Sequence, residues 1–201
     1  MVSFIMQFLK NPRTIGAVAP SSSCLARKMM EPIDFSRASC IVEYGPGLGA
    51  FTRELVKRKK KDTALILIEQ NPQFCRRLEE IYGGDKNVSI IQGGAEHGRT
   101  YLTKLGYSQA DYIVSGLPFT SLPGEITAEI FANTQKILGK GGTFITFQYS
   151  LLKKGLFQEY FRLIGCGLAF WNLPPAYVLV MKVDKKRKGR ETGGGLYPDC
   201  G

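Results

Sequence analysis

The chain has 201 residues, of which 44% are hydrophobic and 22% are charged, values typical of one soluble globular domain with a substantial core. No apolar run reaches the ~18 residues that a membrane-spanning helix needs, which argues against an integral membrane protein. The formal net charge of +10 favours an anionic partner, with nucleic-acid phosphate and anionic lipid as the two candidates.

The cysteines and the single histidine limit the chemistry further. Five cysteines are scattered along the chain without a C-x-x-C pair, which fits a reducing cytoplasm and argues against a disulfide framework or zinc. His97 is the only histidine, so a catalytic triad or a histidine-ligated metal is nearly excluded. The N-terminus lacks a charged leader and a small-residue cleavage site, so no signal peptide is expected. We therefore expect a cytoplasmic protein without a metal.

The first segment, residues 1–38, contains two apolar helical patterns, one before Asn11 and one after Pro20. Their apolar positions are Val2, Ile5, Phe8 and Leu9 in the first pattern and Leu25, Ala26, Met29 and Met30 in the second. One interpretation is that both helices pack as a lid on the domain. The other is that the first helix enters a membrane interface, and a lid that moves is compatible with both.

A glycine-rich turn is the most informative feature of the sequence. An apolar strand with Glu43 near its end leads into Gly45, Gly47 and Gly49, and a helix follows. Glycine lets the backbone turn sharply and approach a ligand, while the helix directs free N–H groups into the turn. Glu69, twenty positions after Gly49, ends the next apolar strand, where a Rossmann-type sheet hydrogen-bonds a ribose. The pattern predicts an adenosine-containing cofactor.

The rest of the chain alternates strands and helices through short connections, which predicts a mostly parallel, doubly wound α/β sheet. The last two strands, joined through Pro174 and Pro175, are expected to form an antiparallel hairpin. Strands are predicted at 40–44, 64–69, 87–91, 111–115, 143–149, 167–171 and 176–183, and helices at about 50–60, 72–82, 124–138 and 151–164. The domain at 39–183 is followed by a basic flexible tail at 184–201.

Two basic clusters carry much of the positive charge. Residues 57–61 end the helix after the glycine turn, where lysines also complement the helix dipole. A solvated helix end is therefore the simpler interpretation of this cluster. The second cluster, Lys182 and residues 185–190, follows the last strand.

A Ser-Gly-Leu-Pro-Phe segment, residues 115–119, follows the fourth predicted strand. This is the carboxyl edge of the sheet, where doubly wound proteins bind ligands. The turn would present Phe119 to the cofactor, and an aromatic face gains about 0.5–2 kcal/mol from a nearby cationic group. The alternative is an ordinary structural turn with Phe119 in the core.

The segment 42–49, Val-Glu-Tyr-Gly-Pro-Gly-Leu-Gly, resembles motif I of class I S-adenosylmethionine-dependent methyltransferases. To about residue 183 the chain resembles ribosomal-RNA adenine dimethyltransferases and, more closely, bacterial phospholipid N-methyltransferases. The matching segments are residues 8–22, 42–52, 69–75, 115–119, 147–149 and 172–176. The adenine enzymes place an Asn where this chain has Ser115 or Gly116, and nothing here after residue 183 corresponds to their helical RNA-binding domain.

The resemblance implies a Rossmann-like class I methyltransferase fold, with a seven-stranded, mostly parallel sheet, an antiparallel last strand and helices on both faces. It implies S-adenosylmethionine as the cofactor. The positions that match the family's cofactor contacts are Thr14, Ser21, Glu43, Tyr44, Gly45, Gly47, Gly49, Glu69, Gln70, Ala95, Glu96, Ser115 and Leu117. One departure is Gly94, where an Asp usually reads the adenine amine. Either Glu96 or the backbone of Ala95 would take over that contact.

The implied reaction is N-methylation of a phosphatidylethanolamine-type lipid at the inner, anionic membrane surface. Ser115, Phe119 and Tyr149 are then the candidates for lining the acceptor pocket. The acceptor amine must lose its proton before it can react, and Tyr149 is favoured as the base over Tyr44 and His97. RNA adenine-N6 methylation and cofactor binding without catalysis are the alternatives, and no obligate protein partner is evident.

Overall fold

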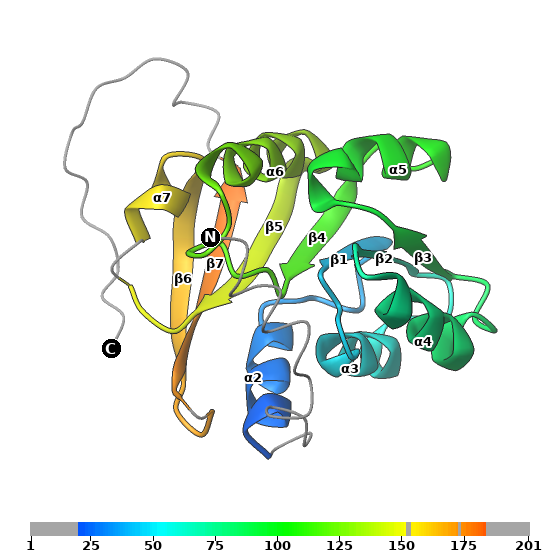
Figure 1. The fold of residues 1–201 in the computed structure, drawn as a ribbon, viewed down its shortest axis with the longest axis horizontal. Helices are drawn as coiled ribbons and strands as arrows, with labels where there is room; N and C mark the ends of the chain where they lie inside the picture. The colour runs from blue at the N-terminus through cyan, green and yellow to red at the C-terminus, as the bar shows by residue number, and fades with distance from the viewer. Residues whose placement is uncertain (1–19, 152–153, 173, 184–201) are drawn as a thin grey trace.

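A seven-stranded sheet forms the centre of the molecule (Figure 1). The computed structural model describes residues 20–151, 154–172 and 174–183. The strand order is β3-β2-β1-β4-β5-β7-β6, in which β7 runs antiparallel to both of its neighbours and the other neighbouring pairs are parallel. The strands are β1 (Cys40–Tyr44), β2 (Ala64–Glu69), β3 (Val88–Gln92), β4 (Ala110–Ser115), β5 (Leu138–Gln148), β6 (Phe161–Ala169) and β7 (Ala176–Val183).

Helices cover both faces of this sheet (Figure 1). One layer holds α2 (Pro20–Met30), α3 (Ala50–Arg58) and α4 (Pro72–Tyr82). The opposite layer holds the short 3-10 helix η1 (Ala95–His97) with α5 (Gly98–Lys104), α6 (Gly124–Ile137) and α7 (Lys154–Gln158). The predicted fold class, with helices on both faces and an antiparallel last strand, is confirmed.

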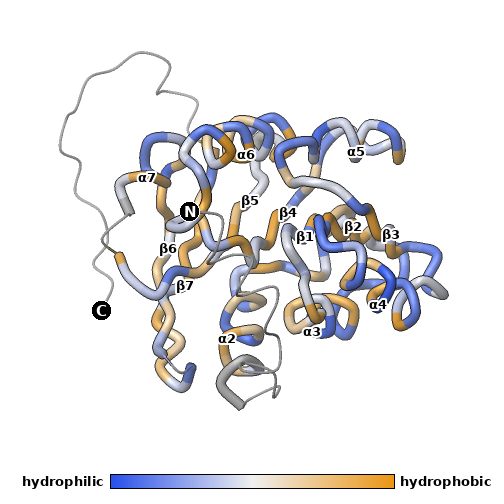
Figure 2. Tube along the Cα trace, in the orientation of Figure 1, coloured by the Kyte–Doolittle hydropathy of each residue, from blue (hydrophilic) through white to orange (hydrophobic). Residues whose placement is uncertain are grey.

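Two apolar clusters, one on each face of the sheet, make up the core. Successive side chains of a strand point to opposite faces, so Ile41 joins the cluster under α3 whereas Val42 and Tyr44 join the cluster under α6. β1 and β2 are buried along their whole length. This is the burial expected of parallel strands covered on both sides, and Figure 2 shows the hydrophobic strands between helices of mixed polarity.

The segment after β5 differs from the prediction. The sequence predicts one helix at 151–164 and a strand at 167–171, but α7 is short and β6 begins well before residue 167. Phe161 and Leu163 are buried while Arg162 between them is exposed. This alternation has the period of a strand, and it outweighed the helical interpretation of the same residues.

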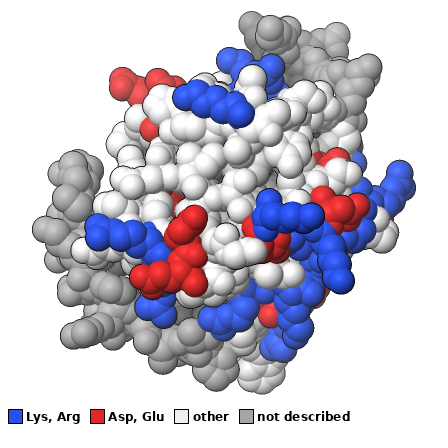
Figure 3. Space-filling view, turned by 90° about the vertical axis from the view of Figure 1, so that its right-hand side faces the viewer, with Lys and Arg blue, Asp and Glu red and all other residues white. Residues whose placement is uncertain are grey.

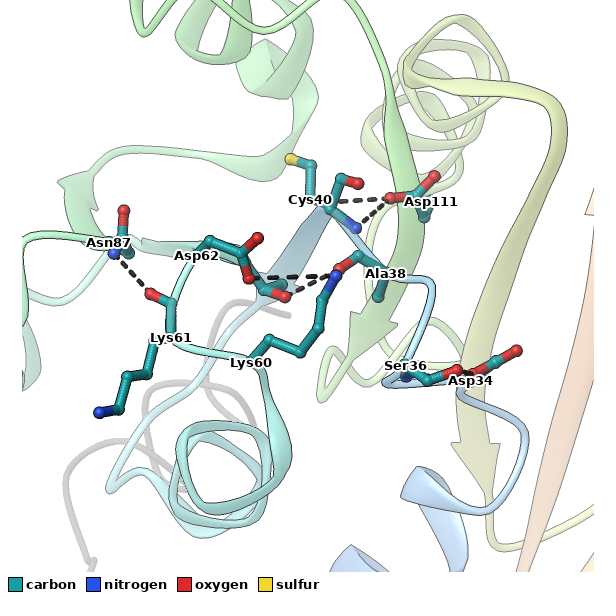
Figure 4. Close-up of polar contacts among 11 residues, drawn as sticks. Asp34, Ser36, Ala38, Cys40, Lys60, Lys61, Asp62, Asn87 and Asp111 are labelled. Carbon is teal, nitrogen blue, oxygen red and sulfur yellow. Dashed lines mark hydrogen bonds and ion pairs between the residues drawn. The ribbon is translucent and has the colours of Figure 1, made fainter.

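The basic residues 57–61 lie at the amino edge of the sheet, because α3 runs back from the glycine turn toward the start of β2. Three of them form ion pairs: Arg58 with Glu54 at 2.7 Å, Lys59 with Asp85 at 3.0 Å and Lys60 with Asp62 at 3.9 Å. Figure 4 shows the Lys60–Asp62 pair beside the hydrogen bond from Asn87 Nδ2 to the Lys61 carbonyl. These ion pairs favour an internally paired cluster, in which the Lys59 side chain is nearly buried.

The surface around α4 and β3 is of mixed charge. Basic side chains gather toward the lower right of this view, and acidic side chains lie among them (Figure 3). A shallow groove on the outer side of α4, lined by Gln73, Arg76, Arg77, Glu80 and Ile81, is part of this surface. It carries none of the predicted site residues.

Within the described ranges, no helix has the length and apolarity needed to cross a bilayer. In the same residues, no group of three or more His, Cys, Asp or Glu side chains could hold a metal. Cys24, Cys40 and Cys75 are free thiols.

Candidate active site

The glycine turn lies at the carboxyl edge of the sheet, between β1 and α3. Gly45, Gly47 and Gly49 have φ angles of 64°, 55° and 80°, in the left-handed region that other residues rarely adopt. A Cβ on Gly45 would lie 2.8 Å from the Leu117 Cδ2 atom, whereas a Cβ on Gly47 would meet nothing within 4 Å. The turn therefore offers bare backbone to the open side at Gly47.

Glu69 ends β2 beside this turn, and its side chain is nearly buried. One carboxylate oxygen accepts the Gly47 N–H at 2.9 Å, and the other accepts the Asn71 N–H at 2.8 Å. Each oxygen has a second lone pair. Glu69 thus holds the turn in place and keeps two acceptor positions for vicinal hydroxyl groups of a ligand.

Glu43 supports the turn from inside the protein. Its carboxyl is fully buried; Oε2 accepts a hydrogen bond from Thr52 Oγ1 at 2.8 Å, and Oε1 has no partner. Burial raises the pKa of Glu43 to about 8, and the Glu69 charge acts in the same direction against the opposing Thr52 bond. The group is therefore protonated at neutral pH. The predicted direct contact of Glu43 with a ligand is wrong, because complete burial confines it to positioning Thr52 and the first turn of α3.

The segment after β3 brings a second carboxylate toward the same edge. The Glu96 side chain is 17% exposed, and a Cβ added to Gly94 would collide with its carboxylate. The Glu96 carboxylate therefore fills the volume that an acidic side chain at residue 94 would enter. Ala95 between them is buried, and Gln70 is exposed after the end of β2.

The loop after β4 packs against the glycine turn. The Gly116 N–H donates to the Tyr44 carbonyl at 2.8 Å, and a Cβ on Gly116 would lie 2.9 Å from the Gly45 carbonyl oxygen. Ser115 is fully buried, and its hydroxyl accepts the Leu117 N–H at 3.2 Å. The predicted role of Ser115 in lining the acceptor pocket is wrong, because its side chain is used inside the loop, whereas Leu117 stays half-buried beside the turn.

Phe119 does not face the site. Its ring is 1% exposed, and its centroid lies 4.8 Å from that of Phe131, 5.6 Å from Phe157 and 6.0 Å from Phe144. The prediction that Phe119 is presented to the cofactor is wrong. The alternative, a structural turn with the ring in the core, is the observed arrangement, since the aromatic cluster under α6 takes up the side chain.

Tyr44 is also directed into the core. Its side chain is fully buried, with its hydroxyl 3.4 Å from Thr134 Oγ1 on α6, and burial raises the pKa of the phenol. Tyr44 is therefore excluded as the base and is present at the edge only through its backbone. His97 is exposed, with Nε2 3.9 Å from Glu96 Oε1, which matches a solvated loop histidine.

Tyr149 lies just beyond β5 and is 55% exposed. Its ring centroid is 5.5 Å from that of Phe147, which is 5.9 Å from that of Phe51 on α3. The Phe51 ring in turn reaches within 3.7 Å of the position of a Cβ on Gly116. The result is an aromatic row that runs from the loop after β4 to the exposed tyrosine. Phe51 and Phe147 are not among the predicted site residues, although the two-residue spacing of Phe147 and Tyr149 places these two on one side of the strand.

Two predicted contacts cannot be located. Thr14 lies outside the described residues, and Ser21 belongs to α2 without a described side chain. Four of the predicted positions do converge: the structure brings Gly45, Gly47, Glu69 and Leu117 together at one edge of the sheet. Such a site can hold a ligand with hydroxyl groups beside an apolar and aromatic wall.

Comparison with known proteins assigns the family. The sequence profile of the family described as Ribosomal RNA adenine dimethylase matches residues 2–153. The chain belongs to this family. It is an S-adenosylmethionine-dependent methyltransferase, as the resemblance in motif I implied.

Individual relatives differ in what they methylate. Over 175 residues the methyltransferase is 31% identical to ornithine lipid N-methyltransferase of Singulisphaera acidiphila, covering 86% of this chain and 91% of that protein. It is 27% identical over 110 residues to the probable ribosomal RNA small subunit methyltransferase A of Methanosarcina mazei, covering 55% of this chain and 36% of that protein. The N-methyltransferase NodS of Bradyrhizobium japonicum, solved with S-adenosyl-L-homocysteine, shares the fold with a TM-score of 0.70 at 15% identity; the match covers 89% of this chain and 98% of NodS.

Proposed function

We propose that this methyltransferase methylates the primary amine of a lipid head group of the phosphatidylethanolamine type at a membrane surface. The observation that carries this proposal is the extent of the two sequence matches. The chain matches a lipid N-methyltransferase over nearly that protein's full length, but it matches an rRNA methyltransferase over only about a third of that protein's length. The loop after β4, here called the acceptor loop, supports the same choice. The adenine enzymes use an amide at this loop, whereas Ser115 is buried and its hydroxyl is bonded to Leu117 N–H.

The residues present fit S-adenosylmethionine. Bare backbone at Gly47 allows close approach, and the free lone pairs of Glu69 suit the two ribose hydroxyls. We assign the Glu96 carboxylate to accept the hydrogen bond of the adenine amine, because this carboxylate occupies the space that an acidic side chain at residue 94 would enter. When bound, the cofactor supplies an electrophilic methyl group on a sulfonium.

The chain's own contribution is positioning, exclusion of water and removal of one proton. The aromatic row of Phe51, Phe147 and Tyr149 forms a wall next to the loop after β4, and such faces attract a cationic ammonium. Tyr149 is the exposed member at the edge, so its hydroxyl oxygen is assigned to accept the proton that the ammonium releases while the original hydroxyl proton passes to water. This leaves the amine lone pair free for in-line attack.

The test uses a radiolabelled methyl donor with three separate acceptors: phosphatidylethanolamine vesicles, ornithine-lipid vesicles and ribosomal RNA. Label in either lipid, with a rate that Tyr149→Phe lowers most at acid pH, is the expected result. The two lipid samples distinguish between head groups that share a primary amine. Label in RNA alone would establish the adenine reaction instead. S-adenosyl-L-homocysteine binding without label in any acceptor would leave a cofactor-binding protein.

A further inference from the structure

The two most exposed large hydrophobic side chains of the described residues are adjacent in sequence. Phe170 is 65% exposed and Trp171 is 79% exposed, and their ring centroids are 5.7 Å apart in an edge-to-face arrangement. Both follow the end of β6. Single exposed apolar residues are common on proteins, but a contacting pair of large aromatic rings at the end of a hairpin needs a reason.

The residue that follows the pair, Asn172, is buried and hydrogen-bonded. Asn172 is 6% exposed; its N–H donates to the Ala169 carbonyl at 3.2 Å, and its Nδ2 donates to the Pro174 carbonyl at 2.7 Å. The polar residue is therefore held inside the turn while the two apolar rings before it stay outside. This inverts the usual distribution of polar and apolar side chains in a turn, and it presents the rings with little conformational freedom to lose on binding.

The strand register places this pair at the edge that carries the active site. β7 pairs antiparallel with both β5 and β6, through Gln148 with Tyr177 and through Ala169 with Ala176. The ends of β5 and β6 therefore lie at the same edge, two strand spacings or about 10 Å apart. Figure 1 shows the β6–β7 connection extending past the end of β5, on the side toward which β4 also points. Tyr149 and the partly exposed Leu48 of the glycine turn face out at this edge as well.

The pair also lies in a segment without charge. No Asp, Glu, Lys or Arg occurs from Leu163 to Met181, although 22% of the chain is charged. A bilayer head-group region accepts such a surface, because tryptophan and phenylalanine rings partition there while charged groups resist entry. A lipid amine that reacts at this edge must come from such a bilayer.

We propose that Phe170 and Trp171 insert into the head-group region of a phospholipid bilayer and hold the carboxyl edge of the sheet against it. This inference rests on the proposed function, because contact with a bilayer serves the reaction only if the acceptor is a lipid. It differs from electrostatic attraction by the basic clusters, because the binding that it contributes needs no anionic lipid and persists in high salt.

Trp171 is the only tryptophan of the chain, so tryptophan fluorescence reports on this surface alone. On addition of phosphatidylcholine vesicles at high salt, its emission is expected to shift to the blue and to be quenched by brominated acyl chains. Phe170→Ala should reduce the vesicle affinity about tenfold or more. Ile81→Ala is the matched control: Ile81 is 55% exposed, and it lies at the end of α4, near the amino edge of the sheet. This control should bind as the unaltered protein does.

A second measurement separates the surface from the reaction. Trp171→Ala should lose methyl transfer to vesicles but keep it on a short-chain, monomeric lipid with the same head group. Vesicle-dependent fluorescence without any methyl transfer would refute the proposed function and leave the membrane surface standing. Methyl transfer to vesicles with unchanged Trp171 emission would overturn the surface. A blue shift that depends on protein concentration and not on lipid would overturn it too, in favour of contact between two copies.

Discussion

Glu43 is an acid that the fold keeps protonated, since burial raises its pKa to about 8 from a usual value near 4.5. The unfolded chain ionises this group above about pH 4.5, while the folded protein retains the proton up to about pH 8. Its contribution to stability is therefore complete below pH 4.5 and is lost as the pH rises to 8. At about 1.4 kcal/mol per pKa unit, the loss at pH 7 is on the order of 3 kcal/mol.

We expect Glu43→Gln to remove this loss, because the amide cannot ionise and its oxygen still accepts the Thr52 hydroxyl. The variant should unfold at a higher urea concentration than the unaltered protein at pH 8 and at nearly the same concentration at pH 4. Glu80→Gln, at an exposed position on α4, is the control without this pH dependence. A difference that is the same at both pH values would show that folding does not raise the pKa of Glu43.

Glu69 and Glu96 are assigned to different parts of the cofactor, and calorimetry can tell them apart. Glu69→Ala should weaken S-adenosylhomocysteine and its deaminated, inosine-containing analogue alike, by about 1.5–3 kcal/mol, because both ligands carry the ribose. Glu96→Ala should weaken only the adenosine form and so remove the preference between the two. If that preference survives in Glu96→Ala, the backbone near Ala95 reads the adenine.

The individual residues show what sequence can and cannot supply. The neighbourhood of Gly47 and Glu69 was predictable, because strand length and turn spacing fix where the two segments meet. The side-chain directions of Phe119 and Tyr44 were not, because each is decided by partners on α6, far along the chain. The sequence left two alternatives for the adenine contact, the Glu96 carboxylate and the Ala95 backbone. The side-chain rotamer of Glu96, which places its carboxylate over Gly94, could not be predicted from sequence.

Among the elements, those with a strong local pattern were predicted well. β1 and β2 are continuous apolar runs bounded by polar residues, and α4 begins at the Asn71 cap with a following proline. β6 was misassigned, because it is an edge strand whose inner side is set by pairing with β7. Its sequence alone fits a helix or a strand over short windows.

The aromatic cluster under α6 makes Phe119 a stability residue, and this gives a prediction at the scale of the helix. Phe119→Ala should cost about 3–5 kcal/mol, because it leaves a cavity between Phe131, Phe144 and Phe157. Phe119→Leu should cost clearly less. Both effects are measured by urea unfolding, with cofactor affinity at low temperature nearly unchanged in the Leu variant. A Phe119→Ala protein that stays stable but loses methyl transfer would instead indicate that the ring acts in the active site.

At the scale of the whole molecule, the two edges of the sheet have different characters. The carboxyl edge carries the glycine turn, the acceptor loop and the exposed aromatic residues, whereas the basic residues 57–61 lie at the amino edge and are largely ion-paired. A membrane at the carboxyl edge would therefore be distant from this cluster. Electrostatic attraction must come from elsewhere, and Arg27 is exposed on α2 while Lys28 is paired with Glu31 at 2.8 Å.

We expect attraction from the basic residues 185–190 and Arg27, at about 1 kcal/mol per basic residue near the surface, with residues 1–10 as an apolar anchor. These terminal segments lie outside the described residues. Cosedimentation with vesicles should rise with anionic lipid and fall with salt. Equal binding to neutral and anionic vesicles would contradict the electrostatic attraction. Full binding after deletion of residues 1–10 would contradict the role of this segment as an anchor.

The contact between Gly45 and the loop after β4 has a consequence for how this protein can change. A Cβ at Gly45 would strike Leu117, and a Cβ at Gly116 would strike the Gly45 carbonyl, although the two segments are about seventy residues apart in the chain. Positions 45 and 116 are therefore closed to substitution, the first also because its φ angle is positive and the second because the obstacle is a backbone atom. An engineer who wants to widen the acceptor site for a larger head group should keep both glycines. A library of smaller residues at position 117, which supplies the only side chain of this contact, is where altered acceptor specificity should be found.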